Sequence, residues 1–240
     1  MSQLDNARSK TEHEFSFISE SPMPAPTDHT SYPVFLAVQV EGEAKGVRTA
    51  QALRIAACTL LERAALQDLT IGAICKEAGV ANGTFYLYFP DQAHLLDDLL
   101  QGFAAFLQAG MIRASQSSPE RSMRPATEAY ARLFEANRGL MKCLIHHLDA
   151  FPAARAAFHR LNREWIDTVV AATRRRLARE GRGTLSDAEL TRRAYALGGM
   201  TDQYFSSLYL SGEAGLVDVS ADRAAVIATL TTIWERGLQP

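Results

Sequence analysis

The sequence predicts an all-α protein with a small N-terminal unit and a larger C-terminal helical domain. Apolar residues recur at spacings of three and four over most of residues 47–237, as they do on the buried face of an α-helix. Sharp breaks containing Pro or Gly divide this pattern, at Pro90, Pro152 and 180–187. A composition of 47% hydrophobic and 22% charged residues is that of an ordinary globular chain.

The first 44 residues differ from the rest of the chain. Residues 1–44 hold two basic and seven acidic residues, and residues 1–31 are rich in Pro, Ser and Thr. Such a segment buries too little apolar surface to order itself, so an acidic, flexible tail is predicted. Alternating apolar residues from Val34 to Val40 also allow a short strand or an extended segment lying on the body.

Three helices are expected in the N-terminal unit. The first begins near Val47. The second has Thr70 as its N-cap and ends at Gly79, a residue suited to the left-handed conformation of a C-cap. The third runs from Asn82 through Phe89. Because the second and third are short and joined by the turn AGVAN, they have the spacing of a helix-turn-helix.

A long helix is expected after Pro90, and four more segments with a helical pattern follow it. These cover residues 125–147, 152–180, 186–211 and 220–237. The glycine-containing stretch at 211–222 is predicted to be a break between helices. All of these helices together form the larger domain.

The N-terminal unit strongly resembles the DNA-binding domain of the TetR (tetracycline-repressor) family of transcription regulators. The stretches LRIAACTLL, LTIGAICKEAGV, NGTFYLYF and PDQAHLLDDLL match in order and spacing over residues 48–96. The resemblance implies a helix-turn-helix DNA-binding domain at 45–92 and a ligand-binding and dimerisation domain at 93–240. Gly72 and Gln92 stand where the family commonly has basic residues, so the third helix is expected to carry more of the recognition.

Helix spacing separates core from contact positions within NGTFYLYF. Phe85 and Phe89 lie four residues apart on one face and are predicted to be core. By resemblance, the other side faces a double-stranded DNA operator, where an amide suits adenine and an apolar side chain suits a thymine methyl. The predicted DNA-binding residues are Lys45, Arg48, Thr70, Asn82, Gly83, Thr84, Tyr86, Leu87, Tyr88 and Gln92. For Tyr86, an interhelical hydrogen bond is the alternative role.

The resemblance also implies two sites in the C-terminal domain. A small-molecule effector, apolar or aromatic, is expected in a cavity formed by Phe134, Met141, His147, Phe158, Asn162, Trp165, Val169, Met200, Thr201 and Phe205. A homodimer is expected to form through Leu190, Leu197, Tyr204, Leu208, Val226, Leu230 and Ile233. An intrachain core is the alternative for both sets.

The cysteine spacing and the N-terminal sequence argue against a metalloprotein, a disulfide-bonded protein and a membrane protein. The three cysteines are widely spaced and lie near no paired histidines, so no metal, disulfide or cofactor is indicated. The first thirty residues lack a basic segment followed by an apolar one, and YPVFLAVQV is too short to span a bilayer, which predicts a cytoplasmic protein with no membrane partner. The expected function is that of a repressor released from a palindromic operator by its ligand. The alternatives are a degenerate helix-turn-helix protein that acts through a protein partner, or a helical enzyme.

Overall fold

The computed structural model describes residues 29–117, 122–183 and 185–240. Within these ranges the chain forms helices and turns but no β-strand, which confirms the all-α prediction. The α-helices are α2 (Tyr32–Val38), α3 (Lys45–Leu61), α4 (Ile71–Ala78), α5 (Asn82–Phe85), α6 (Gln92–Ser117), α7 (Arg124–Ala136), α8 (Arg138–His146), α9 (Pro152–Arg179), α10 (Asp187–Phe205), α11 (Ala214–Val219) and α12 (Arg223–Gly237). Three single turns accompany them: η1 (Leu66–Asp68), η2 (Leu148–Ala150) and the π-helical η3 (Ser206–Ser211).

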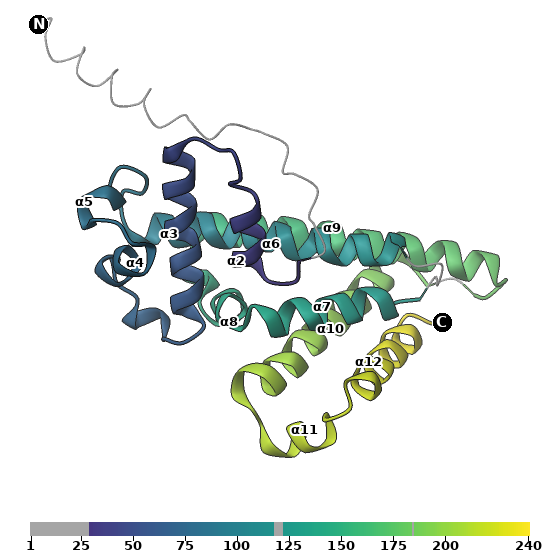
Figure 1. Cartoon of the computed structure of the whole chain (residues 1–240). Helices are drawn as coiled ribbons and strands as arrows, with labels where there is room; N and C mark the ends of the chain where they lie inside the picture. Colours follow the sequence, from purple (N-terminus) through teal and green to yellow (C-terminus); the bar gives the residue numbers. More distant parts are fainter. Residues whose placement is uncertain (1–28, 118–121, 184) are drawn as a thin grey trace, which may run out of the picture.

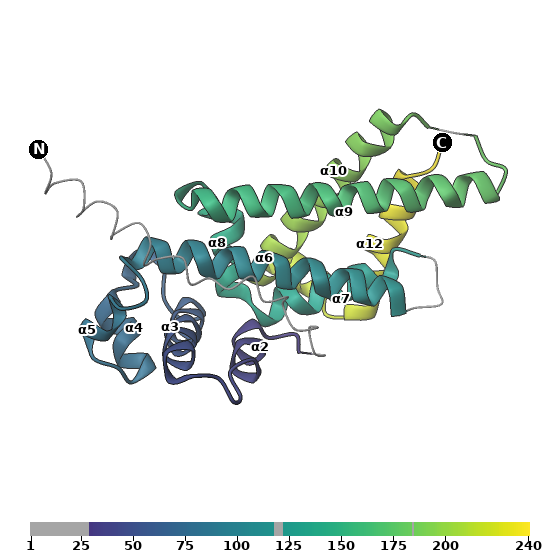
Figure 2. The ribbon, with the colours of Figure 1, turned by 90° about the horizontal axis from the view of Figure 1, so that it is seen from above.

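The molecule has a small helical end and a longer helical body. Helices α2 to α5 gather at one end, and the long helices α6 and α9 run side by side through the body (Figure 1). In the view of Figure 1, α7, α8, α10 and α12 lie below this pair, and the view from above in Figure 2 shows α6 and α9 running alongside each other. Helix α6 therefore connects the small end to the C-terminal helices.

Local signals place the helix-turn-helix as predicted. The Thr70 hydroxyl accepts a hydrogen bond from the backbone N–H of Ala73 at 3.1 Å and so caps α4. Gly79 ends α4 with φ at 68°, a left-handed conformation that strains any residue with a Cβ. The backbone N–H of Val80 then donates to the carbonyl of Cys75 at 3.0 Å, which closes the turn.

The segment predicted to be a strand or an extended peptide is instead the helix α2. Seven consecutive residues are too few to separate a period of two from a period of 3.6, because nearly every position in the segment is apolar. Tyr32, Phe35 and Leu36 share one helix face and are buried against the body, while Val34 on the other side is 46% exposed. Tyr32–Val38 is thus not part of a free tail, and residues 1–28 lie outside the described part of the chain.

Asn137 joins α2 to the body and divides the helix expected over 125–147. Its side-chain oxygen accepts from the backbone N–H of Tyr32 at 2.7 Å, and its amide donates to the carbonyls of Thr30 at 2.8 Å and Leu133 at 2.7 Å. The backbone of Asn137, with φ at −138°, is not helical, so two helices, α7 and α8, replace the single one. The hydrogen bonds of the buried Asn137 side chain to backbone groups take the place of the backbone hydrogen bonds that a continuous helix would have formed here.

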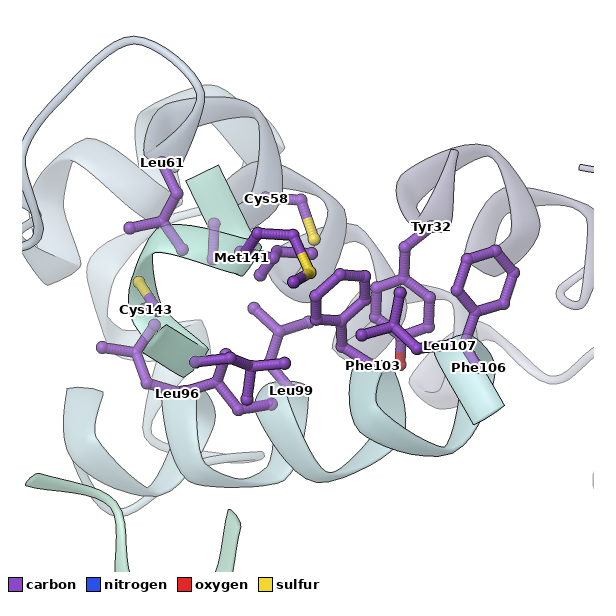
Figure 3. Close-up of a cluster of buried hydrophobic side chains, with 14 of the residues drawn as sticks. Tyr32, Cys58, Leu61, Leu96, Leu99, Phe103, Phe106, Leu107, Met141 and Cys143 are labelled. Atoms are coloured by element: carbon purple, nitrogen blue, oxygen red, sulfur yellow. The ribbon is translucent and has the colours of Figure 1, made fainter. Parts of the chain in front are cut away.

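Helix α6 forms the centre of the hydrophobic core. Its residues Leu96 and Phe103 face Cys58 of α3 and Met141 of α8 in a cluster of buried side chains (Figure 3). In the described part of the chain, the stretch Gln92–Gln116 is the one long and apolar enough to cross a membrane by length and composition alone. Its apolar face is covered by neighbouring helices, as that of a core helix is.

The C-terminal helices follow the predicted pattern with two differences. The segments expected at 152–180 and 220–237 are α9 and α12. The helix expected over 186–211 is α-helical to Phe205 and ends in the π-helical turn η3. The stretch 211–222, predicted to be a break, contains the short helix α11.

Candidate nucleic-acid interface and ligand pocket

The recognition turn is held from behind by the two predicted core rings. Phe85 and Phe89 are 0% and 5% exposed, and their ring centroids lie 5.7 Å apart. The guanidinium of Arg54 in α3 lies 5.1 Å from the Phe89 ring centroid and donates to the carboxylate of Asp98 in α6 at 2.7 Å. The turn is therefore fixed to both α3 and α6.

The third helix is shorter than predicted. Helix α5 ends at Phe85, and a hydrogen-bonded turn carries the chain on to Phe89, whose backbone N–H donates to the Phe85 carbonyl at 3.0 Å. Pro90 disfavours the helical conformation of the residue before it, which explains why a regular helix does not continue through Phe89. The separation of core from outer positions is kept although the helix is short.

Two large side chains project from this turn into solvent. Tyr86 is 59% exposed and Leu87 is 75% exposed, while their neighbour Phe85 is fully buried. Within the described residues the Tyr86 hydroxyl has no hydrogen-bond partner, so the interhelical bond considered for it is not formed. Leu87 and Tyr86 are thus available for contact with another molecule.

The other residues predicted to contact DNA lie near the turn or on the neighbouring helix starts. Asn82 and Gly83 are exposed in the first turn of α5, and Lys45 and Arg48 are exposed in the first turn of α3. Tyr88 is partly buried and lies against Gly46 of α3. The remaining three are Thr70, whose hydroxyl caps α4, and the partly buried Thr84 and Gln92.

A cavity of about 270 Å³ lies in the body between α6, α9 and α10. Three of the predicted ligand-binding residues, Phe158, Asn162 and Trp165, line it. Two polar groups that the sequence did not single out also line it, namely Tyr130 of α7 and Asp202 of α10. The Tyr130 hydroxyl donates to the Asp202 carboxylate at 2.6 Å.

Burial sets the protonation of this pair. It raises the pKa of Asp202 from its ordinary value of 3.8 to about 6, and the hydrogen bond from Tyr130 opposes part of that rise. Burial also holds the pKa of the Tyr130 hydroxyl well above its usual range. The pair is therefore a carboxylate near its titration range beside a hydroxyl that stays protonated.

Two predicted ligand-binding aromatics lie behind the cavity wall instead of on it. Phe134 and Phe205 are fully buried, and their ring centroids lie 6.0 Å and 5.9 Å from that of Tyr130. They hold Tyr130 in place from within the core. They do not line this cavity, because helical spacing marks a buried face without showing whether a cavity or a side chain covers it.

The other five predicted ligand-binding residues also lie off this cavity. Thr201 accepts a hydrogen bond from the indole of Trp234 at 2.9 Å, and Val169 lines a separate cavity of about 420 Å³ with Arg175 and Arg176. Met141, His147 and Met200 line neither of the two cavities. The missed lining residues include Asp202, Tyr195, Gly198 and Gly199 on α10. No signal in the sequence marked them, because Asp202 stands one residue away from the apolar stripe that contains Leu197, Thr201 and Tyr204.

The predicted dimer residues divide between the interior and the surface. Leu190, Val226 and Leu230 are at most 5% exposed and lie in this chain's own core, which is the alternative considered for them. Leu197 packs close to Gly237, and Tyr204 is hydrogen-bonded to Ser220 at 2.8 Å. Leu208 is partly buried, and Ile233 is 39% exposed.

Comparison with known proteins agrees with the geometry of the small helical end. Residues 54–99 match the model of the tetR family of bacterial regulatory proteins. The HTH-type transcriptional regulator EthR of Mycolicibacterium smegmatis is 26% identical over 184 residues, which cover 73% of this chain and 79% of that protein.

Two solved structures show the same fold over most of both chains. The fatty acid degradation regulator FadR from Bacillus halodurans has a TM-score of 0.60 at 15% identity, covering 78% of this chain and 94% of that one. FadR from Bacillus subtilis in complex with stearoyl-CoA has a TM-score of 0.55 at 15% identity, covering 75% and 96%. The small helical end, with its matching family model and its exposed recognition turn, is a DNA-binding domain of the tetR type, and the chain is a TetR-type DNA-binding transcriptional regulator.

Proposed function

We propose that this regulator is a repressor that binds a palindromic operator as a homodimer and leaves it when a small apolar ligand binds. The observation that carries the DNA part is the contrast within the recognition turn. Tyr86 and Leu87 are largely exposed, whereas Phe85 and Phe89 on either side of them are buried. Because the buried rings fix the turn, Tyr86 and Leu87 are held in position to enter a major groove. There Leu87 contacts a thymine methyl group.

Charge supports local rather than long-range attraction to DNA. The net charge of −2 gives the whole molecule no attraction to a polyanion. Lys45 and Arg48 supply two cations beside the turn, and the N-terminal amides of α4 and α6 add partial positive charge. Two subunits on successive half-sites double these contacts, which favours a dimer on a palindrome.

Helix α6 links the proposed ligand site to the recognition turn. It begins at Gln92, directly after the turn, and it lines the cavity with Ala104, Leu107, Gln108 and Met111. A ligand that displaces α6 therefore moves the turn, and two recognition turns must stay about 34 Å apart to fit successive major grooves. A shift in favour of the ligand-bound spacing lowers operator affinity.

The cavity supports a small apolar effector. It is mostly lined by apolar and aromatic side chains, as small-molecule sites are. FadR from Bacillus subtilis holds stearoyl-CoA in its solved structure, and that likeness supports a ligand-binding role for the domain without naming the ligand. The site of action proposed for such a regulator is the cytoplasm.

Substitution of Tyr86 by alanine tests the contact surface. Binding of the dimer to DNA from around its own gene is measured by fluorescence anisotropy at two salt concentrations. The Tyr86→Ala protein is expected to lose about tenfold or more in operator affinity, the usual cost of one specific contact, while keeping its circular dichroism melt. Val217→Ala, at a side chain that is 42% exposed on α11, is the matched control and is expected to bind as the parent does.

Two outcomes count against the proposal. If both Tyr86→Ala and Leu87→Ala bind the operator like the parent protein, the contact surface is elsewhere. If the parent shows no preference for any sequence near its gene over random duplex DNA, the proposed operator is absent and the repressor assignment fails.

A further inference from the structure

The cavity between α6, α9 and α10 suits one chemical class of ligand. We propose that Asp202 makes this cavity select an apolar amine, bound as its cation, and reject a carboxylate of the same carbon skeleton. The claim that such an amine is the effector rests on the proposed function, whereas the claim that it binds in the cavity does not.

The walls provide for an apolar body. Leu107, Phe158, Trp165 and Ile166 contribute hydrophobic surface from α6 and α9. The facing helix α10 contributes Gly198 and Gly199 to the cavity wall. A Cβ built at either glycine would have no atom within 4 Å. The two glycines thus leave open the space into which an alkyl or aryl group fits.

The charge in the cavity has one sign. Asp202 is a carboxylic acid on the wall, and the amide of Gln108, another wall residue, donates at 3.3 Å to a second carboxylate, that of Glu164 at the exposed surface. Among the described side chains that line the cavity there is no Lys, Arg or His. A ligand carboxylate would lose its hydration there and meet like charge, so acids are disfavoured.

Asp202 also has hydrogen-bonding capacity left for a ligand. The two oxygens of a carboxylate accept about four hydrogen bonds in all. Tyr130 supplies one, and across the described residues no other side chain donates to Asp202. A ligand ammonium fills the remaining positions with charge-assisted bonds, which offset the cost of taking both charges out of water.

The orientation of the acceptor is fixed before any ligand arrives. The Tyr130 ring contacts the rings of Phe134 and Phe205, both fully buried, so the hydroxyl that holds Asp202 has little freedom. An acceptor held in advance discriminates between ligand head groups more sharply than a mobile one, because less ordering is required on binding.

A series of three probes with one skeleton tests the selectivity. The full-length protein is titrated calorimetrically at pH 8, where Asp202 is ionised, with 4-phenylbutylamine, 4-phenylbutanol and 4-phenylbutyrate. The amine is expected to bind at least about tenfold more tightly than the alcohol, the effect of one hydrogen bond to a charged group, and the acid is expected to bind most weakly. In Asp202→Asn the preference for the amine over the alcohol is expected to vanish.

Two further variants locate and control the effect. Gly198→Leu fills the open space in front of α10 and is expected to abolish binding of all three probes while leaving the fold intact. Asp218→Asn removes an exposed carboxylate on α11 that does not line the cavity, and it is expected to bind all three as the parent does. Equal or tighter binding of the acid than the amine, or an unchanged ranking in Asp202→Asn, overturns the proposal, as does a parent protein that binds none of the three.

Operator binding separates this proposal from the repressor function. If the amine binds with the expected ranking but leaves DNA affinity unchanged, the cavity is selective as proposed and the ligand-released repressor is contradicted. If the three probes fail to bind while another small molecule releases the operator, the selectivity assigned to Asp202 is wrong and the proposed function stands.

Discussion

A single buried carboxylate makes the stability of this protein depend on pH. Burial raises the pKa of Asp202 from 3.8 to about 6 in the folded state, so folding favours the protonated acid. The stabilisation is complete below pH 3.8 and is lost as the pH rises through about 6. By linkage, the ionised side chain at pH 8 costs about 3 kcal/mol relative to the fully protonated one.

Replacement by asparagine is expected to remove this cost. The free energy of unfolding of Asp202→Asn should exceed that of the parent at pH 8 and approach it at pH 4.5, when both are measured by urea denaturation. The asparagine oxygen still accepts from Tyr130, so the packing is kept. A difference between the two proteins that is the same at both pH values would show that the carboxyl titrates normally in the folded state.

Some helices are determined by residues within or next to them, whereas others depend on contacts with distant parts of the chain. Helix α4 and its turn follow from Thr70 and Gly79 because an N-cap and a left-handed C-cap act within four residues. Helix α2 does not, because its helical conformation depends on burial against the body and on Asn137, about a hundred residues away. The spacing of apolar residues therefore gives the wrong secondary structure for short segments, such as α2, whose conformation is set by tertiary contacts.

The docking of α2 predicts a sharp difference between two identical substitutions. A methyl group added at Gly102 of α6 would overlap the Tyr32 hydroxyl, and the Tyr32 ring has no room to move because it lies against the rings of Phe103 and Phe106. Gly102→Ala is therefore expected to cost about 1–3 kcal/mol, in the range of overpacked cores, and to speed hydrogen exchange in α2.

The matched control is a glycine at an exposed position of a helix. Gly72→Ala in α4 meets no atom within 4 Å and is expected to be neutral or to stabilise by about 0.5–1 kcal/mol, as alanine does in a helix. Equal thermal stability of the two variants would mean that α2 does not pack against α6 as the structure has it.

At the scale of the whole molecule, the order of helices was predictable and the position of the cavity was not. The periodicity of each helix gives its buried face, which places Phe85 and Phe89 in the core. It cannot say what covers that face, so Phe134 and Leu230 were assigned to sites although this chain's own helices enclose them. The place of Asp202 on a cavity wall depends on how α6, α9 and α10 pack together, which the sequence of α10 alone does not determine.

The proposed dimer depends on what remains exposed after that packing. On α12, Ile233 is 39% exposed, whereas Val226 and Leu230 of the same helix are buried in this chain's own core. An exposed large apolar side chain on a helix surface favours contact with another molecule, so the face of α12 that carries Ile233 is the expected contact with a second copy.

Charge placed on this face should separate the copies. Ile233→Glu is expected to change the mass in solution from dimer to monomer, measured by light scattering after gel filtration, because an unpaired carboxylate would be buried between subunits. Operator affinity is expected to fall by at least about a hundredfold, since each half-site then has to be bound separately. Val34→Glu, a change at a side chain 46% exposed on α2, should leave the dimer intact. A dimeric Ile233→Glu protein would place the contact on another face, and a parent protein that is monomeric on its operator would contradict the symmetric arrangement itself.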